Sequence, residues 1–147
     1  MIHIKRIRGA RRADLEAVIE IDALITRARK PEYWAEALRR YGGRGRSRFF
    51  LVADTDEGVR GYIVGEVRDW AFGQPPCGWV FEMGVHPRAR LGGIGTQLLE
   101  ALCKSMRAAG VDKVRTLLAR DNGLVLAFFR SQGLMAAPLI TLEKDLE

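Results

Sequence analysis

The sequence predicts a single α/β domain over residues 1–147, built on a mixed, mostly antiparallel sheet flanked by helices. Three observations lead to this expectation. The chain has 147 residues, the size of one domain with one core. Hydrophobic residues make up 48% of it and charged residues 29%, which is typical of a globular fold. Its patterns run in the order strand, two helices, three strands, helix, strand, helix, strand, and no linker is long enough to divide domains.

The N-terminal third is expected to form a strand and two helices. The first strand is predicted over Ile2–Arg8. Apolar residues then recur at helical spacing over Asp14–Arg27, and the carboxylate at its start favours a helix N-terminus. A second helix is predicted over Pro31–Arg40, because proline suits the first helical position. The glycine-rich segment Gly42–Ser47 is expected to be a loop.

The middle third predicts a hairpin and a further strand. Phe49–Asp54 and Arg60–Val67 are rich in β-branched and aromatic residues, and turn-forming residues separate them. The segment Arg68–Gly78 contains two prolines and is expected to be a loop. The next strand is predicted over Trp79–Val85.

The last third alternates helices and strands. The strongest helical pattern covers Gly93–Ala109, where apolar residues share one face and Gly110 ends the helix. A strand is predicted over Lys113–Leu118, a short helix over Leu124–Ser131 and a last strand over Leu139–Glu143.

The net charge of +6 lies almost entirely in the N-terminal part of the chain. Residues 1–60 hold 14 Lys or Arg against 9 Asp or Glu, whereas residues 61–147 hold 10 against 9. Such a surface attracts polyanions, either nucleic acid or the phosphates of a nucleotide cofactor. Few aromatic residues interleave these cations, so a platform for stacking bases is not indicated. No apolar run approaches the roughly 20 residues that span a bilayer, so we expect a cytoplasmic protein without a membrane partner.

A glycine-rich turn between a strand and a helix is the centre of the functional prediction. The turn and helix start run from Arg90 to Thr96, with glycines at positions 92, 93 and 95. The first turn of a helix presents N–H groups without internal partners and a partial positive charge. Glycines let a phosphate approach these groups closely. No lysine of a P-loop is present, and Leu98 stands where a dinucleotide fingerprint needs its third glycine.

Two motifs resemble the GNAT superfamily of N-acetyltransferases. Arg90-x-x-Gly93-x-Gly95 is similar to the family's acyl-CoA signature. Asn122, followed by Ala127-Phe128-Phe129 and Gly133-Leu134, resembles its later motif. The element order matches the GNAT fold across essentially the whole chain. The resemblance implies a single GNAT domain that takes acetyl-CoA as co-substrate and needs no metal.

The resemblance also implies where acetyl-CoA lies. Its pantetheine arm would enter a gap between the Trp79–Val85 and Lys113–Leu118 strands, and its pyrophosphate would meet the glycine-rich turn. The expected cofactor-binding residues are Met83, Gly84, Val85, Arg90, Leu91, Gly92, Gly93, Ile94, Gly95, Thr96, Asn122, Phe128 and Phe129. For the two phenylalanines, a place in the core is the alternative.

The catalytic base is expected to be a carboxylate on a central strand. Glu82 is the first candidate, since its apolar neighbours should desolvate it and favour a proton acceptor near neutral pH. Glu66 is the second candidate. The alternative for each is a salt bridge with an arginine such as Arg68 or Arg115.

The family often has a tyrosine as general acid where this chain has Phe129. A phenyl ring has no proton to donate, so the thiolate would leave unprotonated or take a proton from water or another group; Ser131 is the nearest hydroxyl in sequence. The first two helices wall the acceptor site in this fold, so Asp22, Tyr33 and Trp34 are the expected amine-binding residues, by charge and cation–π contact. The alternative is that the two aromatic residues seal their helix onto the sheet.

The predicted function is transfer of an acetyl group from acetyl-CoA to a primary amine by direct attack. The acceptor is expected to be a small-molecule or peptide amine, and a homodimer is left open. One alternative is a non-catalytic acyl-CoA-binding module. A less favoured one is a basic nucleic-acid-binding protein.

Overall fold

The computed structural model describes residues 2–147, which separate into two compact units. The sheet unit extends to Leu117, and the C-terminal unit covers Leu118–Glu147. The expectation of one domain over residues 1–147 stays a prediction.

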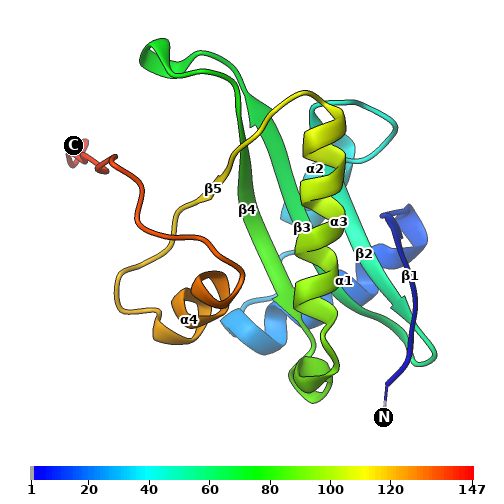
Figure 1. Cartoon of the computed structure of the whole chain (residues 1–147). Helices are drawn as coiled ribbons and strands as arrows, with labels where there is room; N and C mark the ends of the chain where they lie inside the picture. The colour runs from blue at the N-terminus through cyan, green and yellow to red at the C-terminus, as the bar shows by residue number, and fades with distance from the viewer. Residues whose placement is uncertain (1) are drawn as a thin grey trace. The chain divides into compact units, whose positions relative to one another are not determined.

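The sheet unit contains five strands in the order β1-β2-β3-β4-β5 (Figure 1). Neighbouring strands from β1 to β4 are antiparallel, and β4 and β5 are parallel. The sheet is therefore mixed and mostly antiparallel, as the sequence predicts. The strands are β1 (Ile4–Gly9), β2 (Arg48–Thr55), β3 (Gly58–Arg68), β4 (Cys77–Val85) and β5 (Val114–Thr116).

Helices cover both faces of this sheet. Figure 1 shows α3 (Ile94–Ala108) crossing the front of the sheet, with α1 (Leu15–Thr26) and α2 (Pro31–Tyr41) behind it. The alternation of side chains along β3 accounts for this arrangement. Tyr62 and Val64 belong to the core cluster that α1 and α2 help to form.

Gly61 and Gly65 of β3 face the opposite way and let α3 approach closely. A Cβ atom on Gly61 would lie 2.7 Å from Ile94 and 3.0 Å from Leu98. A Cβ atom on Gly65 would lie 3.1 Å from both Leu102 and Met106 of α3, and 2.5 Å from the Trp79 carbonyl oxygen of β4. Real Cβ contacts are not that short, so the packing of α3 depends on these glycines.

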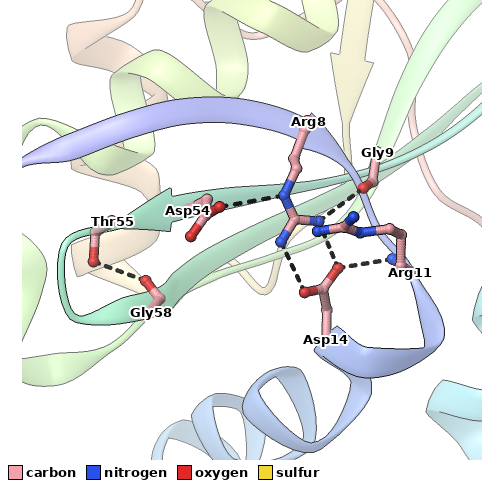
Figure 2. A network of polar contacts seen from close by, with 7 residues as sticks. All are labelled: Arg8, Gly9, Arg11, Asp14, Asp54, Thr55 and Gly58. Atoms are coloured by element: carbon pink, nitrogen blue, oxygen red, sulfur yellow. Dashed lines mark hydrogen bonds and ion pairs between the residues drawn. The ribbon is translucent and has the colours of Figure 1, made fainter.

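A network of ion pairs fixes β1 to β2 and to the start of α1 (Figure 2). The Arg8 guanidinium donates to both carboxylate oxygens of Asp14, at 2.7 and 2.9 Å, and to Asp54 at 3.4 Å. The Arg11 backbone N–H also donates to Asp14, at 2.8 Å. Burial by itself would raise the pKa of Asp14, but the bonds from Arg8 and Arg11 outweigh it and hold that pKa below its usual value.

The C-terminal unit contains α4 (Gly123–Ser131) and no strand in its described residues. The predicted strand over Leu139–Glu143 is therefore wrong. Its apolar character is real, but Ile140 and Leu142 are each 84% exposed. A strand needs a neighbouring strand for its backbone groups, and no described segment pairs with this one. The strand predicted over Lys113–Leu118 is also shorter than expected, since β5 ends at Thr116.

Candidate active site

A β-bulge in the middle of β4 shapes the candidate site. In the pairing of β3 with β4, Val64 lies opposite Glu82 and the next residue, Gly65, lies opposite Val80. Phe81 is thus an extra residue without a partner on β3. Regular alternation would send Phe81 and Glu82 to opposite faces of the sheet, whereas a bulge can turn both toward one face. Both side chains indeed line the same cavity.

The Glu82 carboxylate is paired with a phenol. Tyr33, in the first turn of α2, donates a hydrogen bond from its hydroxyl to Oε2 of Glu82. Burial raises the pKa of Tyr33, and the hydrogen bond to Glu82 raises it further, because both disfavour the phenolate. Tyr33 therefore stays protonated near neutral pH, and its hydrogen bond fixes one carboxylate oxygen.

A small cavity of about 160 Å³ opens beside this pair, between α2 and the strands β3 and β4. Its walls are largely aromatic, and Tyr41 meets Phe81 edge-on with ring centroids 6.0 Å apart. Glu82 and Arg68 bring charges of opposite sign to it. The lining residues are Tyr33, Ala37, Tyr41, Val64, Arg68, Phe81 and Glu82.

Two of the predicted acceptor residues lie behind the cavity wall. Trp34 has no exposed surface and packs against Phe50 and Tyr62 at centroid distances of 5.7 and 4.9 Å. Asp22 is 2% exposed and accepts a 2.9 Å hydrogen bond from the Trp34 indole. Lys30 approaches the same carboxylate at 3.2 Å. This burial fits a supporting role, in which Asp22 and Trp34 hold α2 in place, and it leaves Tyr33 as the residue that faces the cavity.

Glu66, the second candidate base, is engaged in ion pairs. Its carboxylate lies 3.3 Å from Nε of Arg68 and 3.8 Å from Nε of Arg48. It is also not among the residues that line the cavity. The geometry therefore favours Glu82 over Glu66 as the proton acceptor.

The edge of β4 is open beside the bulge. β5 pairs only with Gly78, Trp79 and Val80, and the last rung is a 3.0 Å hydrogen bond from the Thr116 hydroxyl to the Val80 carbonyl. Beyond Val80, β3 still pairs with one edge of β4, but no strand in the chain up to Leu117 pairs with the other edge. An extended, amide-bearing ligand could occupy this edge along Met83, Gly84 and Val85.

Gly84 has a tight environment on the α2 side of the sheet. It lies opposite Tyr62 in the strand pairing, and a Cβ atom at Gly84 would lie 2.5 Å from the Tyr62 hydroxyl oxygen. Tyr62 is buried, and burial raises its pKa. The lack of a side chain at Gly84 therefore leaves room for the Tyr62 ring against β4.

The glycine-rich turn leads into α3 as predicted, with small differences in its boundaries. A short 3-10 segment over Pro87–Gly92 precedes the helix, and Gly93 is the N-cap residue with a φ of 75°. A left-handed conformation of this kind favours glycine. At Gly92 and Gly93 no heavy atom lies within 4 Å of the place where a Cβ would be, so the surface there is open.

The flanks of this turn are basic and anchored. Arg88, Arg90 and Leu91 are exposed, while Ile94 is buried and seats the helix on the sheet. The His86 ring accepts a 3.1 Å hydrogen bond on Nδ1 from the backbone N–H of Arg88. An exposed helix start with two adjacent arginines can bind an anion such as a pyrophosphate.

The remaining predicted residues belong to the C-terminal unit. Asn122 is the N-cap of α4, and its side chain accepts a 3.4 Å bond from the Val125 N–H. Phe128 and Phe129 meet edge-on at 5.3 Å, and Phe129 is buried. The Ser131 hydroxyl donates to the Phe128 carbonyl at 2.6 Å. Their roles toward acetyl-CoA stay predictions.

Sequence reasoning missed the aromatic and cationic walls of the cavity. Tyr41 could have been found, because Tyr33, Ala37 and Tyr41 recur every four residues and therefore share one helix face. Phe81 could not, because a bulge in β4 leaves no clear mark in the sequence. A second hollow of about 430 Å³ lies at the other end of α3, lined by residues that include Cys103, Met106 and Lys113. It contains no carboxylate–phenol pair and is separated from Gly93 by about 20 Å of helix.

Comparison with known protein families identifies the family of this chain. A family model described as the acetyltransferase (GNAT) family matches residues 15–134. The chain belongs to the GNAT family. The expectation drawn from the two sequence motifs is thereby confirmed.

One relative with a known activity matches this GNAT chain over part of its length. An N-alpha-acetyltransferase of Sulfurisphaera tokodaii is 36% identical over 110 residues, which cover 69% of this chain and 62% of that protein. The chain thus matches less than two thirds of this relative's length. No helix in residues 2–147 is both long and apolar enough to cross a membrane.

Solved structures share the fold at low identity. An aminoglycoside N-acetyltransferase in complex with CoA superposes with a TM-score of 0.83 at 15% identity, covering 99% of this chain and 96% of that chain. A transcriptional regulator from Bacillus halodurans C-125 gives a TM-score of 0.81 at 20% identity, with 98% and 100% covered. At such identities the likeness shows a common fold, and it confirms the predicted fold class.

Proposed function

We propose that this GNAT protein transfers an acetyl group from acetyl-CoA to a primary amine by direct attack. The observation that carries the proposal is the Glu82–Tyr33 pair, which lies in an aromatic cavity at the β4 bulge, next to the open edge of the strand. A carboxylate held by a phenol can accept the proton of an amine. The adjacent open backbone can hold the arm of a thioester donor.

The residues of the sheet unit fit acetyl-CoA. The exposed turn has a left-handed glycine, no side chain over Gly92 or Gly93, and arginines at positions 88 and 90. These features suit a pyrophosphate at the start of α3. The unpaired edge of β4 suits the amide groups of a pantetheine arm.

Each group then has a role in the reaction. Acetyl-CoA supplies a thioester, which is an activated acyl group. Glu82 accepts the proton that the ammonium group must lose, directly or through one water. Tyr33 positions the carboxylate by its hydrogen bond, and backbone N–H groups along β4 stabilise negative charge on the carbonyl oxygen.

The departing thiolate takes its proton from water, because neither Phe129 nor Ser131 can supply it. Phe129 cannot donate one, and the Ser131 hydroxyl is already bonded to a backbone carbonyl. A thiol has an ordinary pKa near 8.5, so the thiolate can leave and take its proton from water. A cytoplasmic location is part of the proposal, and the two free thiols of the chain suit a reducing compartment.

The test is a panel of primary amines incubated with the protein and acetyl-CoA, with release of free thiol as the readout. Calorimetry with acetyl-CoA is the parallel measurement. Thiol release with at least one amine supports the proposal. Tight binding without release for any amine would instead indicate a non-catalytic acyl-CoA-binding module.

A further inference from the structure

The arginine at the mouth of the cavity is placed to select the acceptor. Arg68 is the last residue of β3, and its guanidinium lies over the Phe81 ring at 4.4 Å and over the Trp79 ring at 5.3 Å. Its side chain is 47% exposed, so it reaches solvent from the cavity wall. Glu82 lines the same cavity.

We infer that the acceptor carries a carboxylate close to its amine, and that Arg68 binds this carboxylate while Glu82 receives the amine. The inference rests on the proposed acetyl transfer and names the chemical class of its substrate. Arg68 is thus a specificity-determining residue rather than a catalytic one.

The hydrogen bonds of Arg68 leave its outer nitrogens available. Glu66 approaches its Nε atom, at 3.3 Å. The two terminal nitrogens have no hydrogen-bond or ion-pair partner among residues 2–147. Contact with two aromatic rings restrains the guanidinium before a ligand arrives. A carboxylate can then accept two parallel N–H bonds from it.

A second arginine lies beside the cavity. Arg40 stacks on the Tyr41 ring of the cavity wall at 5.7 Å. The loop that carries Arg44 and Arg46 is bound to the end of β3 by a 2.7 Å bond from the Val67 N–H to the Ser47 carbonyl. On the β3 side, the carboxylate of Glu66 is already shared between Arg48 and Arg68. Arg68 and Arg40 would attract a negative group on the acceptor.

The size of the cavity limits what enters it. Pockets that enclose a whole drug-sized ligand have volumes of about 300–1,000 Å³. The cavity beside Glu82 has about 160 Å³, so it accepts a small molecule or the end of a larger one. A free amino acid and a peptide that begins with Asp or Glu share the required chemistry, an amine with a nearby carboxylate.

The experiment compares matched acceptors at saturating acetyl-CoA. Peptides beginning with Glu and Gln differ in charge but hardly in shape, while free glutamate and spermidine represent an amino acid and a polycation. We expect kcat/KM for the Glu peptide to exceed that for the Gln peptide by about three- to thirty-fold, as for a half-exposed, charge-assisted pair. The difference should lie mainly in KM and shrink at high salt. Faster turnover of the peptide than of free glutamate would identify peptides as the source, and the reverse would identify amino acids.

Variants assign the preference to Arg68. Arg68→Gln should abolish the difference between the two peptides, Arg68→Lys should keep part of it, and Arg68→Glu should reverse it. Arg6→Gln removes the same charge from an exposed position on β1, an edge strand two strands away from β3, and should leave the preference intact. Thermal unfolding verifies that each variant folds.

Two failures can be told apart. Equal kcat/KM for the Glu and Gln peptides, a preference for spermidine, or an unchanged preference in Arg68→Gln would overturn the inference and leave acetyl transfer in place. If no amine is acetylated, calorimetry tests the inference by itself. It measures the affinities of the Glu and Gln peptides for protein that has been saturated with CoA. Tighter binding of the Glu peptide, lost in Arg68→Gln, supports the inference even though the proposed activity has failed, and equal binding overturns both.

Discussion

Replacing Glu82 by Gln tests the catalytic assignment without emptying the cavity. Glutamine has nearly the same shape, and its amide oxygen can still accept the hydrogen bond that Tyr33 donates to Glu82. The cavity wall and the binding of acetyl-CoA should therefore be unchanged. What is lost is a carboxylate that can take the amine's proton. General-base contributions of this kind correspond to about a hundred- to ten-thousand-fold in rate.

The expected loss of turnover at neutral pH is smaller, about ten- to a thousand-fold, because part of the amine is already neutral. An α-amino group has a pKa of roughly 8, so about a tenth of it is neutral at pH 7 and most of it at pH 9. Raising the pH to 9 should hence recover up to about tenfold of the loss with an α-amine acceptor.

Thiol release measured from pH 6.5 to 9.5 gives the profile, and calorimetry verifies that acetyl-CoA still binds. Glu66→Gln is the matched control, since it removes a carboxylate that pairs with Arg48 and Arg68 but does not itself line the cavity. It should reduce turnover much less. Full activity of the Glu82 variant at neutral pH, with an unmoved pH profile, would refute the reasoning and make Glu82 a structural residue.

Three further predictions concern the frame around the site. Gly84→Ala would bring a Cβ to 2.5 Å from the Tyr62 hydroxyl, so overpacking should lower the free energy of unfolding by about 1–3 kcal/mol in urea titrations; an unchanged midpoint would show that the ring moves freely. Asp14→Asn weakens the hydrogen bonds that Arg8 donates and should lower the free energy of unfolding by about 1.5–3 kcal/mol in the same assay, whereas a change below the error of the measurement would contradict the ion-pair account. Burial, and then the charge of Arg60, lower the pKa of His86 below its ordinary value of 6.5. The contribution of His86 to the free energy of unfolding is therefore full above pH 6.5 and is lost as the pH falls toward the pKa in the folded state. An NMR titration of the His86 ring protons that gives a pKa of 6.5 or higher would contradict this prediction.

Regular elements were predictable because their patterns are local. The glycines before α3, the proline at the start of α2 and the hairpin of β2 and β3 each act within a few residues. The family followed from two such local motifs.

Features that depend on distant partners were not predictable in the same way. Leu139–Glu143 has the composition of a strand, but a strand forms only beside a neighbouring strand. Among residues 2–147 no strand pairs with this segment, and its own composition could not reveal that. Trp34 and Asp22 have the chemistry of an amine-binding site. Inside the core, however, the Trp34 indole donates a 2.9 Å hydrogen bond to the Asp22 carboxylate, so the two groups satisfy each other. The Phe81 bulge, which turns two consecutive side chains toward one cavity, depends on the pairing of β3 with β4.

Binding of acetyl-CoA to the turn at Gly93 is the most direct test of the central claim. Calorimetry of the wild-type protein against Gly93→Glu measures it, with Gly110→Glu as a control. Both glycines have a positive φ, of 75° and 96°, and neither has a heavy atom within 4 Å of the Cβ position, so the backbone strain is similar in the two variants. We predict that wild-type protein and Gly110→Glu bind acetyl-CoA, whereas Gly93→Glu remains folded and does not, because its carboxylate occupies and repels the place of the pyrophosphate. No binding by the wild-type protein at millimolar acetyl-CoA, or unchanged affinity in a folded Gly93→Glu variant, would contradict the account.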